Sequence, residues 1–222
     1  MGVLFKNPKT RLRNLIIIIS FFVLLAVFFV IFSINSLSTT LDAATNDTID
    51  VSEKYVIRSM DYHLRNNATA FQEELFSELK DCIENGSREE IAKSVAENFV
   101  ADFYTWTNKS GLYDVGGMCY IYGPNKNNMC FQARDYFYHY LNYYIDEYGQ
   151  SNLLEVESID SSVEKRESYA YENSEYDAYF VICNWAYKDN AKFPTDGYYT
   201  REYFTVIDHN GRFEIVEAYG DE

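Results

Sequence analysis

Cysteine and histidine, the side chains that most often bind metal ions or attack substrates, are few in this chain. It has four cysteines and three histidines among 222 residues. A zinc site is usually built from closely spaced pairs of these residues, but there is no CxxC pair, and His63, His139 and His209 lie far apart. The GxSxG, P-loop and HExxH motifs are missing from the sequence as well. We therefore expect a protein that is not an enzyme, with no metal and no other cofactor.

One run of apolar residues predicts where the rest of the chain is placed. Residues 15–34 (LIIIISFFVLLAVFFVIFSI) have only Ser20 and Ser33 as polar members. A helix rises about 1.5 Å per residue, so a run of this length spans the roughly 30 Å hydrocarbon core of a bilayer. A cleaved secretory signal is the alternative, but its apolar region is usually about 7–15 residues long and ends in a small-x-small cleavage site. No Ala-x-Ala pattern follows closely, so we predict a retained transmembrane helix at residues 15–35.

The charges beside this helix predict its orientation. Four basic residues at positions 6 to 13 precede it without an acidic neighbour, whereas the first charge after it is Asp42. Positively charged flanks tend to stay in the cytoplasm. We therefore predict a cytoplasmic tail at 1–14, a single-pass anchor in the cell membrane that contacts the lipid bilayer, and an extracytoplasmic C-terminal part.

The part beyond the helix is strongly acidic and rich in tyrosine. It carries all 34 Asp and Glu residues and 15 of the 19 Lys and Arg residues, which gives it a net charge of −19. Such a surface repels nucleic-acid backbones and anionic headgroups, so we expect no nucleic-acid partner. Of the 21 tyrosines, 19 lie at or after Tyr104. This predicts an aromatic core rather than a platform for a carbohydrate or another ligand.

The four cysteines, Cys82, Cys119, Cys130 and Cys183, all lie in the part expected outside the membrane. Disulfides can persist there, and four cysteines allow three full pairings that the sequence cannot separate. Cys119 and Cys130 are our preferred pair because they bracket the polar loop at 123–128. Cys183 lies within an apolar strand pattern, which favours a buried free thiol.

The region before the folded domain is predicted to be a helical stalk at 36–86. Apolar residues recur every three or four positions over 48–83, which is typical of one face of a helix. This stripe must be covered either by the domain that follows or by a second copy of the stalk. The second arrangement would give a homo-oligomer through a coiled coil.

The domain itself is predicted at 87–222, and it begins with two helices. Ser87 and Glu90 match a capping box, which starts a helix extending to about Trp106. A further helix runs from about 128 to 148 and is ended by Gly149.

After Gly149 the apolar period changes from 3.6 to 2, which predicts strands. The expected strands are 153–159, 163–171, 176–187, 198–207 and 212–219, with a short earlier one at 118–122. The strand at 176–187 is apolar on both faces for most of its length, as in a central strand. Asn210-Gly211 is a strong signal for a two-residue hairpin turn. The predicted fold class is α+β, with helices packed on an antiparallel sheet.

This order of elements resembles the nuclear-transport-factor-two-like family, also called the cystatin-like cone. In that family a strongly curved antiparallel sheet wraps helices, and the last hairpin reads as an apolar strand, Asn-Gly or Asp-Gly, an aromatic residue, then Ile-Val. The segment TVIDHNGRFEIVEAYG (205–220) fits this pattern, and the likeness covers roughly 87–219. The layout is especially similar to the inner-membrane assembly component of type IV secretion and conjugation systems, which has a short basic tail, one span, a helical connector and an outer cone.

The resemblance implies a cavity between the sheet and the helices. Some relatives, such as ketosteroid isomerase-like enzymes, place a carboxylate base and a tyrosine donor there. The candidates in this chain would be Asp135 or His139 as the base, with Tyr104 or Tyr140 as the donor. Neither Asp135 nor His139 lies squarely on the apolar stripe of its helix, so we expect both at the surface. The candidate cavity or docking residues are Tyr104, Trp106, Tyr140, Tyr144 and Trp185.

These expectations favour a non-enzymatic interaction or assembly module on a membrane anchor, such as a component of a secretion or conjugation complex. Its partners would be other membrane or envelope proteins. The alternative is a small-molecule-binding or catalytic domain that uses the cone cavity. A receptor-like sensor is less favoured, because the tail at 1–14 leaves no room for a cytoplasmic output domain.

Overall fold

The computed structural model describes residues 54–171, 174–190 and 192–220, apart from the side chains at 165 and 166. The residues from Tyr55 onward form one compact unit. The expected tail (1–14) and transmembrane helix (15–35) lie outside the described residues. In the described part, none of the helices combines the length and the apolar character needed to cross a bilayer.

A four-stranded antiparallel meander forms the base of the domain, and each strand pairs with the next along the chain. Its strands are β3 (Val156–Tyr171), β4 (Ser174–Tyr187), β5 (Arg201–His209) and β6 (Arg212–Tyr219). Asn210 and Gly211 join β5 to β6 with φ angles of 56° and 88°. Two successive residues of positive φ make a turn whose twist suits a hairpin, so the hairpin prediction is confirmed.

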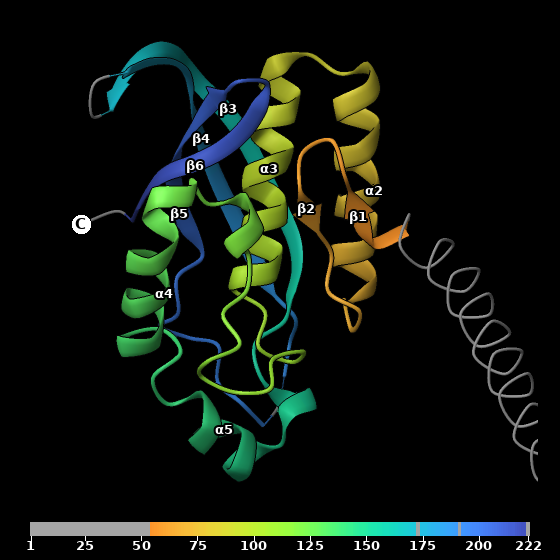
Figure 1. Cartoon of the computed structure of the whole chain (residues 1–222). Helices are drawn as coiled ribbons and strands as arrows, with labels where there is room; N and C mark the ends of the chain where they lie inside the picture. Colours follow the sequence, from red (N-terminus) through yellow and green to blue (C-terminus); the bar gives the residue numbers. More distant parts are fainter. Residues whose placement is uncertain (1–53, 172–173, 191, 221–222) are drawn as a thin grey trace, which may run out of the picture. The chain divides into compact units, whose positions relative to one another are not determined.

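Helices pack on this sheet, which confirms the α+β class. They are α2 (Ala70–Asn85), α3 (Arg88–Phe103), α4 (Lys126–Asp135) and α5 (Leu141–Tyr148). α3 contacts all four strands, and Figure 1 shows it between the sheet and α2. The capping box at its start is formed, because Glu90 N donates to Ser87 Oγ and Ser87 N donates to the Glu90 carboxylate. Gly149 ends α5, as predicted.

The stalk helix predicted at 48–83 is wrong in its first part. Within the described residues, a small hairpin of β1 (Val56–Ile57) and β2 (Tyr62–His63) precedes the helix. α2 begins only after its N-cap residue, Thr69. Tyr62 is fully buried, and its hydroxyl donates to the carbonyl of Phe213 on β6 at 2.5 Å. This tertiary contact holds the segment extended, although its apolar spacing also fits a helix.

α2 itself belongs to the same compact unit as the sheet. Its buried side chains include Leu75, Phe76 and Leu79, and it packs on α3. The Asn98 amide on α3 donates to the carbonyl of Leu75 at 3.0 Å. The apolar stripe is therefore covered by the domain that follows, one of the two expected arrangements. The compact unit begins at Tyr55, ahead of the boundary expected at residue 87.

The helix predicted at 128–148 is divided into α4 and α5. The turn between them directs Tyr138 into the core, where it is fully buried. Its hydroxyl donates to the carbonyl of Phe103 at 2.6 Å and accepts from the N–H of Gly116 at 3.2 Å. The break therefore lets one phenol satisfy two backbone groups beside the C-terminal end of α3.

The short strand predicted at 118–122 is also wrong. Met118–Tyr120 form a turn of 3-10 helix, and Ile121 then makes a single parallel bridge to Ile215 on β6. The N–H of Tyr122 donates to the Ile215 carbonyl at 2.9 Å. The segment thus covers the edge of β6 at one point without adding a strand.

The two strands predicted at 153–159 and 163–171 are one continuous strand, β3. The polar residues between them suggested a loop, yet Ser161 has a partner on the helix layer. Its hydroxyl donates to the carboxylate of Glu97 on α3 at 2.5 Å. A polar residue with such a partner does not interrupt a strand.

The core between helices and sheet is aromatic, as predicted. Its largest fully buried aromatic side chains are Trp106, Tyr62, Tyr120, Tyr138, Tyr179, Phe76, Phe99 and Phe204. β4 is covered on both faces near its middle, because Tyr179 and Ala178 are both buried. Toward its C-terminal end Asn184 and Ala186 are exposed. The prediction of a central strand holds for most of its length.

Candidate functional site

A cavity of about 490 Å³ lies between α4 and the last two strands, and we call it the α4 cavity. Figure 1 shows α4 beside β5 and β6. The cavity is lined by Phe103, Tyr104, Ile121, Asn125, Asn128, Met129, Gln132, Ala133, Phe137, Tyr171, Tyr199, Glu202, Ile215, Val216, Glu217 and Ala218. Its volume falls within the roughly 300–1,000 Å³ of small-molecule sites.

The fold brings two polar side chains, Tyr104 and Glu202, to one wall of this cavity. Tyr104 is the C-cap residue of α3, and its N–H donates to the Val100 carbonyl at 3.0 Å. Glu202 is the second residue of β5 and is paired with Cys183 of β4. Paired residues project from the same face of a sheet. Because Cys183 faces the main core, Glu202 also faces the helices.

Glu202 is the carboxyl group of the α4 cavity whose pKa is shifted. The hydroxyl of Tyr104 donates a hydrogen bond to its carboxylate. The second oxygen, Oε2, is buried and has no hydrogen-bond partner among the described residues. Burial raises the pKa of Glu202 from 4.5 to about 7, and the bond from Tyr104 opposes this only in part. The carboxyl group therefore gains or loses its proton near neutral pH, as carboxyls at functional sites often do.

The lining offers Glu202 no cation as a partner. Of the described residues that line the cavity, only Glu202 and Glu217 carry an ionisable charge at neutral pH. Glu217 accepts from the hydroxyls of Tyr169 at 2.7 Å and Thr205 at 3.3 Å. The rest of the lining consists of aromatic and aliphatic side chains and three amides, Asn125, Asn128 and Gln132. One carboxylate oxygen, Glu202 Oε2, is buried without a partner among the described residues.

The structure divides the five predicted cavity or docking residues between three positions. Tyr104 lines the α4 cavity, and Trp185 is buried behind it, with the two ring centroids 4.4 Å apart. Trp106, Tyr140 and Tyr144 instead line a smaller hollow of about 240 Å³. In that hollow Trp106 is buried, whereas Tyr140 is mostly exposed.

The two hollows share part of their walls. Phe137 and Tyr199 line both of them. Phe137 also stacks on Phe103 with centroids 5.4 Å apart and meets Tyr104 edge-on at 5.1 Å. The aromatic side chains that the sequence singled out are therefore close to each other, but only Tyr104 reaches the α4 cavity.

The other predicted residues lie outside the cavity. Asp135 and His139 are exposed, as expected. All four cysteines are free thiols, so the Cys119–Cys130 disulfide that we predicted is not formed in this structure. Cys119 Sγ instead donates to the carbonyl of His63 at 3.5 Å. Cys183 is fully buried, as predicted.

Sequence reasoning missed Glu202, although a signal was present. Along β5, Glu202, Phe204 and Val206 alternate with residues of the opposite face. Phe204 and Val206 belong to the core. An acidic residue in register with two core residues is unusual, because a charged side chain is rarely buried without a partner.

A second group of buried charges lies at the C-terminal end of α3, and we call it the Asp102 cluster (Arg65, Asp102, Lys109 and Asp114). Asp102 Oδ1 accepts from Arg65 Nε at 2.7 Å and from Lys109 Nζ at 2.9 Å, and Oδ2 accepts from Gly117 N at 2.6 Å. Arg65 also donates to Asp114 at 3.2 Å. Burial would raise the pKa of Asp102, but the charges of Lys109 and Arg65 hold it at about 2.

The Asp102 cluster fixes the loop of residues 105–117 and the segment after β2 to α3. Lys109 is fully buried, and burial lowers its pKa to about 8 even though the Asp102 carboxylate favours the charged form. Two cations face two carboxylates at hydrogen-bond distance. This arrangement is what a structural ion cluster requires.

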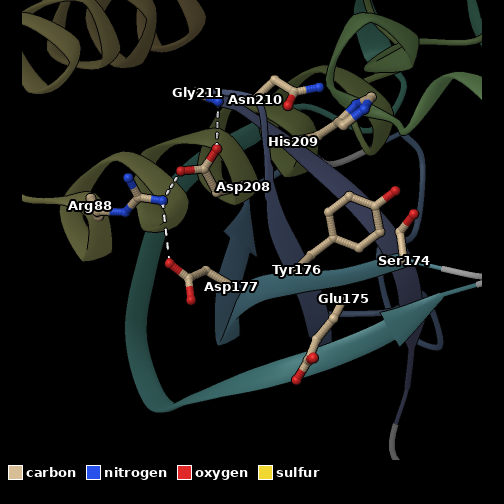
Figure 2. A pocket seen from close by; sticks show the side chains of 9 residues that line it. All are labelled: Arg88, Ser174, Glu175, Tyr176, Asp177, Asp208, His209, Asn210 and Gly211. Atoms are coloured by element: carbon tan, nitrogen blue, oxygen red, sulfur yellow. Dashed lines mark hydrogen bonds and ion pairs between the residues drawn. The ribbon is translucent and has the colours of Figure 1, made fainter.

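A polar hollow of about 560 Å³ lies between the β3–β4 and β5–β6 hairpins. Figure 2 shows Arg88 pointing toward Asp208 and Asp177, with which it forms ion pairs, while Asp208 accepts from the N–H of Gly211. None of the described side chains in this hollow has a buried polar atom without a partner. Its contacts hold the start of α3 against the hairpin and give no reason to expect a ligand.

Comparison with known proteins identifies no relative. No family model matches the chain, and neither a curated protein nor a solved structure is significantly similar to it. Over the described ranges, no group of three or more His, Cys, Asp or Glu side chains is arranged to hold a metal ion.

Proposed function

We propose that this domain binds a small organic molecule in the α4 cavity. The observation that carries the proposal is Glu202, a residue of the cavity lining whose Oε2 is a buried acceptor with no hydrogen-bond partner in the described part of the chain. Leaving such a group unsatisfied destabilises a protein by about 1–3 kcal/mol. A ligand that donates a hydrogen bond to this oxygen would remove that cost. The apolar part of the ligand would then pack against the aromatic side chains of the lining.

Binding is favoured over catalysis by the role of Tyr104. An acid–base site of the isomerase type needs one group to move a proton and a separate donor to stabilise the developing negative charge. The Tyr104 hydroxyl already donates to Glu202. Its proton is therefore not directed at the position where a substrate oxygen would lie.

We also propose that the domain is a cystatin-like cone held outside the membrane by the helix at 15–35. Two features support this assignment. The helices are followed by an antiparallel meander, and its last hairpin turns at Asn210-Gly211. A cavity between the helices and the sheet is the feature that the resemblance implies. The basic tail and the apolar run that follows it support the topology.

A second candidate function is an assembly module whose partners are other membrane or envelope proteins, as in a secretion or conjugation complex. It is favoured by four exposed aromatic side chains on and between α4 and α5: Phe131, Tyr136, Tyr140 and Tyr143. Exposed apolar groups that gather on one surface mark contact sites. Replacing Tyr136 and Tyr140 by serine should then reduce the recovery of crosslinked envelope proteins with the full-length chain. Unchanged recovery would argue against this candidate.

The binding proposal can be tested on the full-length protein in lipid nanodiscs. A library of small molecules is screened for compounds that raise the melting temperature, since a ligand that binds only the folded state stabilises it by mass action. Ala218 is exposed at the mouth of the cavity, so Ala218→Trp should block it without overpacking the core. Ala186, an exposed alanine on β4 away from the cavity, gives the control variant Ala186→Trp.

We expect bound compounds to stabilise the native protein and the Ala186→Trp variant but not the Ala218→Trp variant. The proposal fails if stabilisation persists when the mouth is blocked. It also fails if no compound in a chemically broad library stabilises the native protein.

A further inference from the structure

The charges of the α4 cavity indicate which chemical class it can accept. Its described lining contains two carboxylates, Glu202 and Glu217, and no lysine, arginine or histidine. An anionic ligand would place its charge beside Glu202 in an apolar environment with no compensating cation. Like charges at short range in such an environment are strongly unfavourable. Carboxylates and phosphates are therefore disfavoured as ligands at pH values above about 7, where Glu202 is ionised.

The walls of the cavity favour a positive charge. Five aromatic side chains line it: Phe103, Tyr104, Phe137, Tyr171 and Tyr199. The face of an aromatic ring attracts a cation, and such contacts are stronger when water is excluded. A carboxylate surrounded by aromatic rings is a combination that suits an ammonium group.

The polar groups at the mouth do not compete for the ligand's charge. Asn125 is already used, since its amide donates to the Val216 carbonyl at 2.9 Å and its oxygen accepts from the Tyr171 hydroxyl at 2.8 Å. Asn128 and Gln132 are exposed residues of the lining, so water can satisfy their amides. Of the residues that line the cavity, Glu202 is the one with a buried side-chain polar atom, Oε2, that has no partner among the described residues.

We propose that the ligand of the α4 cavity is an organic amine with an aromatic or aliphatic body, whose ammonium group donates a hydrogen bond to Glu202 Oε2. This inference rests on the proposed binding function and names its ligand class. The body of the ligand would lie against Phe137, Met129 and Ile215. When the ammonium binds to a protonated Glu202, the carboxyl proton is released to solvent, so that the complex is a carboxylate–ammonium pair.

The sign of the pH dependence separates this ligand class from neutral ligands. A bound ammonium favours the carboxylate, so its affinity should rise as pH increases through the Glu202 pKa of about 7. A neutral ligand that accepts a hydrogen bond needs the protonated carboxyl, so its affinity should fall over the same range.

The buried phenols and the thiol near Glu202 titrate well above this range. The groups around it are Tyr104 from α3, Cys183 and Tyr187 from β4, and Glu217 from β6. Burial raises the pKa of Tyr104, Cys183 and Tyr187 further above neutral. A change in affinity near neutral pH can therefore be assigned to Glu202.

The test uses three probes of the same shape: 4-phenylbutylamine, 4-phenylbutanol and 4-phenylbutyrate. Their binding to the full-length protein in zwitterionic nanodiscs is measured by calorimetry, with protein-free nanodiscs to subtract partitioning into lipid. Glu202→Gln removes the charge while keeping the shape. Glu157→Gln, at an exposed glutamate on β3, makes the same change of net charge away from the cavity.

We expect the amine to bind more tightly than the alcohol and the carboxylate not to bind. Glu202→Gln should weaken the amine by about tenfold or more, as expected for a lost hydrogen bond to a charged group. The same change should leave the alcohol nearly unaffected, and Glu157→Gln should alter neither.

The outcomes separate the ligand class from the binding function. If the alcohol binds as well as the amine, and Ala218→Trp blocks both, the cavity binds ligands but the amine assignment is wrong. The amine assignment is also wrong if Glu202→Gln does not weaken binding of the amine. If none of the probes binds up to its solubility limit, the amine assignment is overturned, and the library screen decides separately whether the cavity binds anything.

Discussion

Two largely buried carboxylates, Asp102 and Glu202, lie near the C-terminal end of α3 and have opposite pKa shifts. Asp102 has Arg65, Lys109 and the Gly117 N–H as partners, and its pKa is held at about 2. Glu202 has the Tyr104 hydroxyl and one unpartnered oxygen, and its pKa is raised to about 7. Burial acts in the same direction on both, so the difference comes from the partners that the fold supplies.

This difference distinguishes a charge that the fold compensates from one that it leaves without a full set of partners. At Asp102 the fold has brought two cations to compensate the carboxylate, Arg65 from 37 residues away and Lys109 from 7 residues away in the sequence. At Glu202 it has brought aromatic side chains and a space large enough for a small molecule. A fully compensated charge stabilises the fold, whereas an uncompensated charge on a cavity wall is available to a ligand.

The largest expected effect comes from removing the compensated carboxylate. Asp102→Ala leaves Arg65 and Lys109 with an excess of positive charge in the protein interior, and breaking a buried ion pair in this way destabilises by about 3–5 kcal/mol. Urea unfolding of the full-length protein in micelles can be followed by the fluorescence of Trp106 and Trp185, which are both buried. The exposed Asp135→Ala is the control and should change stability by less than about 0.5 kcal/mol. A small effect at Asp102 would mean that its ion pairs are weak and that the contrast with Glu202 is wrong.

The second largest effect tests whether Asp102 and Lys109 act as a pair. The double variant Asp102→Asn, Lys109→Met removes one charge of each sign and leaves Arg65 with Asp114. We expect it to be more stable than Asp102→Asn alone by about 1–3 kcal/mol, because no uncompensated cation remains. Urea midpoints of the two single variants and the double variant give the coupling energy. Simple additivity of the two single changes would contradict the pairing.

Local signals in the sequence were sufficient for parts of the fold that depend on neighbours along the chain. The capping box of Ser87 with Glu90 and the turn at Asn210-Gly211 form as predicted. Both need contacts only within a few residues, so spacing and residue type determine them.

The parts that could not be predicted depend on contacts between distant residues. Tyr62 is held extended by a carbonyl on β6, and the break before α5 places Tyr138 against two backbone groups near α3. The Asp102 cluster joins residues 65, 102, 109 and 114 only after folding. The resemblance led us to expect a cavity between the helices and the sheet. Tyr104 and Glu202 line the α4 cavity, and the carboxylate comes from β5 rather than from the helix at 128–148.

A smaller effect is expected from the uncompensated carboxylate, and it has the opposite sign. The pKa of Glu202 is raised on folding, so the stability linked to its proton is fully present below about pH 4.5 and is lost as pH rises through about 7. Glu202→Gln removes this loss. The variant should equal the native protein near pH 4.5 and exceed it by about 1–3 kcal/mol above pH 7. Urea midpoints measured from about pH 2 to pH 8.5 check this.

The acid side of the same titration sharpens the contrast between the two carboxylates. The pKa of Asp102 is lowered on folding, so its contribution is present above about pH 3.8 and is lost as pH falls through about 2. The Glu202→Gln variant still contains Asp102. Its stability should therefore still fall at acid pH, as Asp102 becomes protonated. A variant less stable than the native protein at pH 8 would show that Glu202 is compensated after all, and the distinction from Asp102 would disappear.

The smallest effect concerns a site that belongs to neither carboxylate. Gly211 has a φ of 88°, and its N–H donates to Asp208 Oδ1 at 2.6 Å. An alanine in the left-handed region is less favourable by about 1–2 kcal/mol, so Gly211→Ala should lower the urea midpoint slightly at every pH. Combined with Glu202→Gln it should act additively, since the turn and the α4 cavity share no lining residue. If Gly211→Ala instead shifted the pH at which stability changes through the titration of Glu202, that result would show that the hairpin is coupled to the cavity. The pKa of Glu202 could then not be ascribed to its immediate surroundings alone.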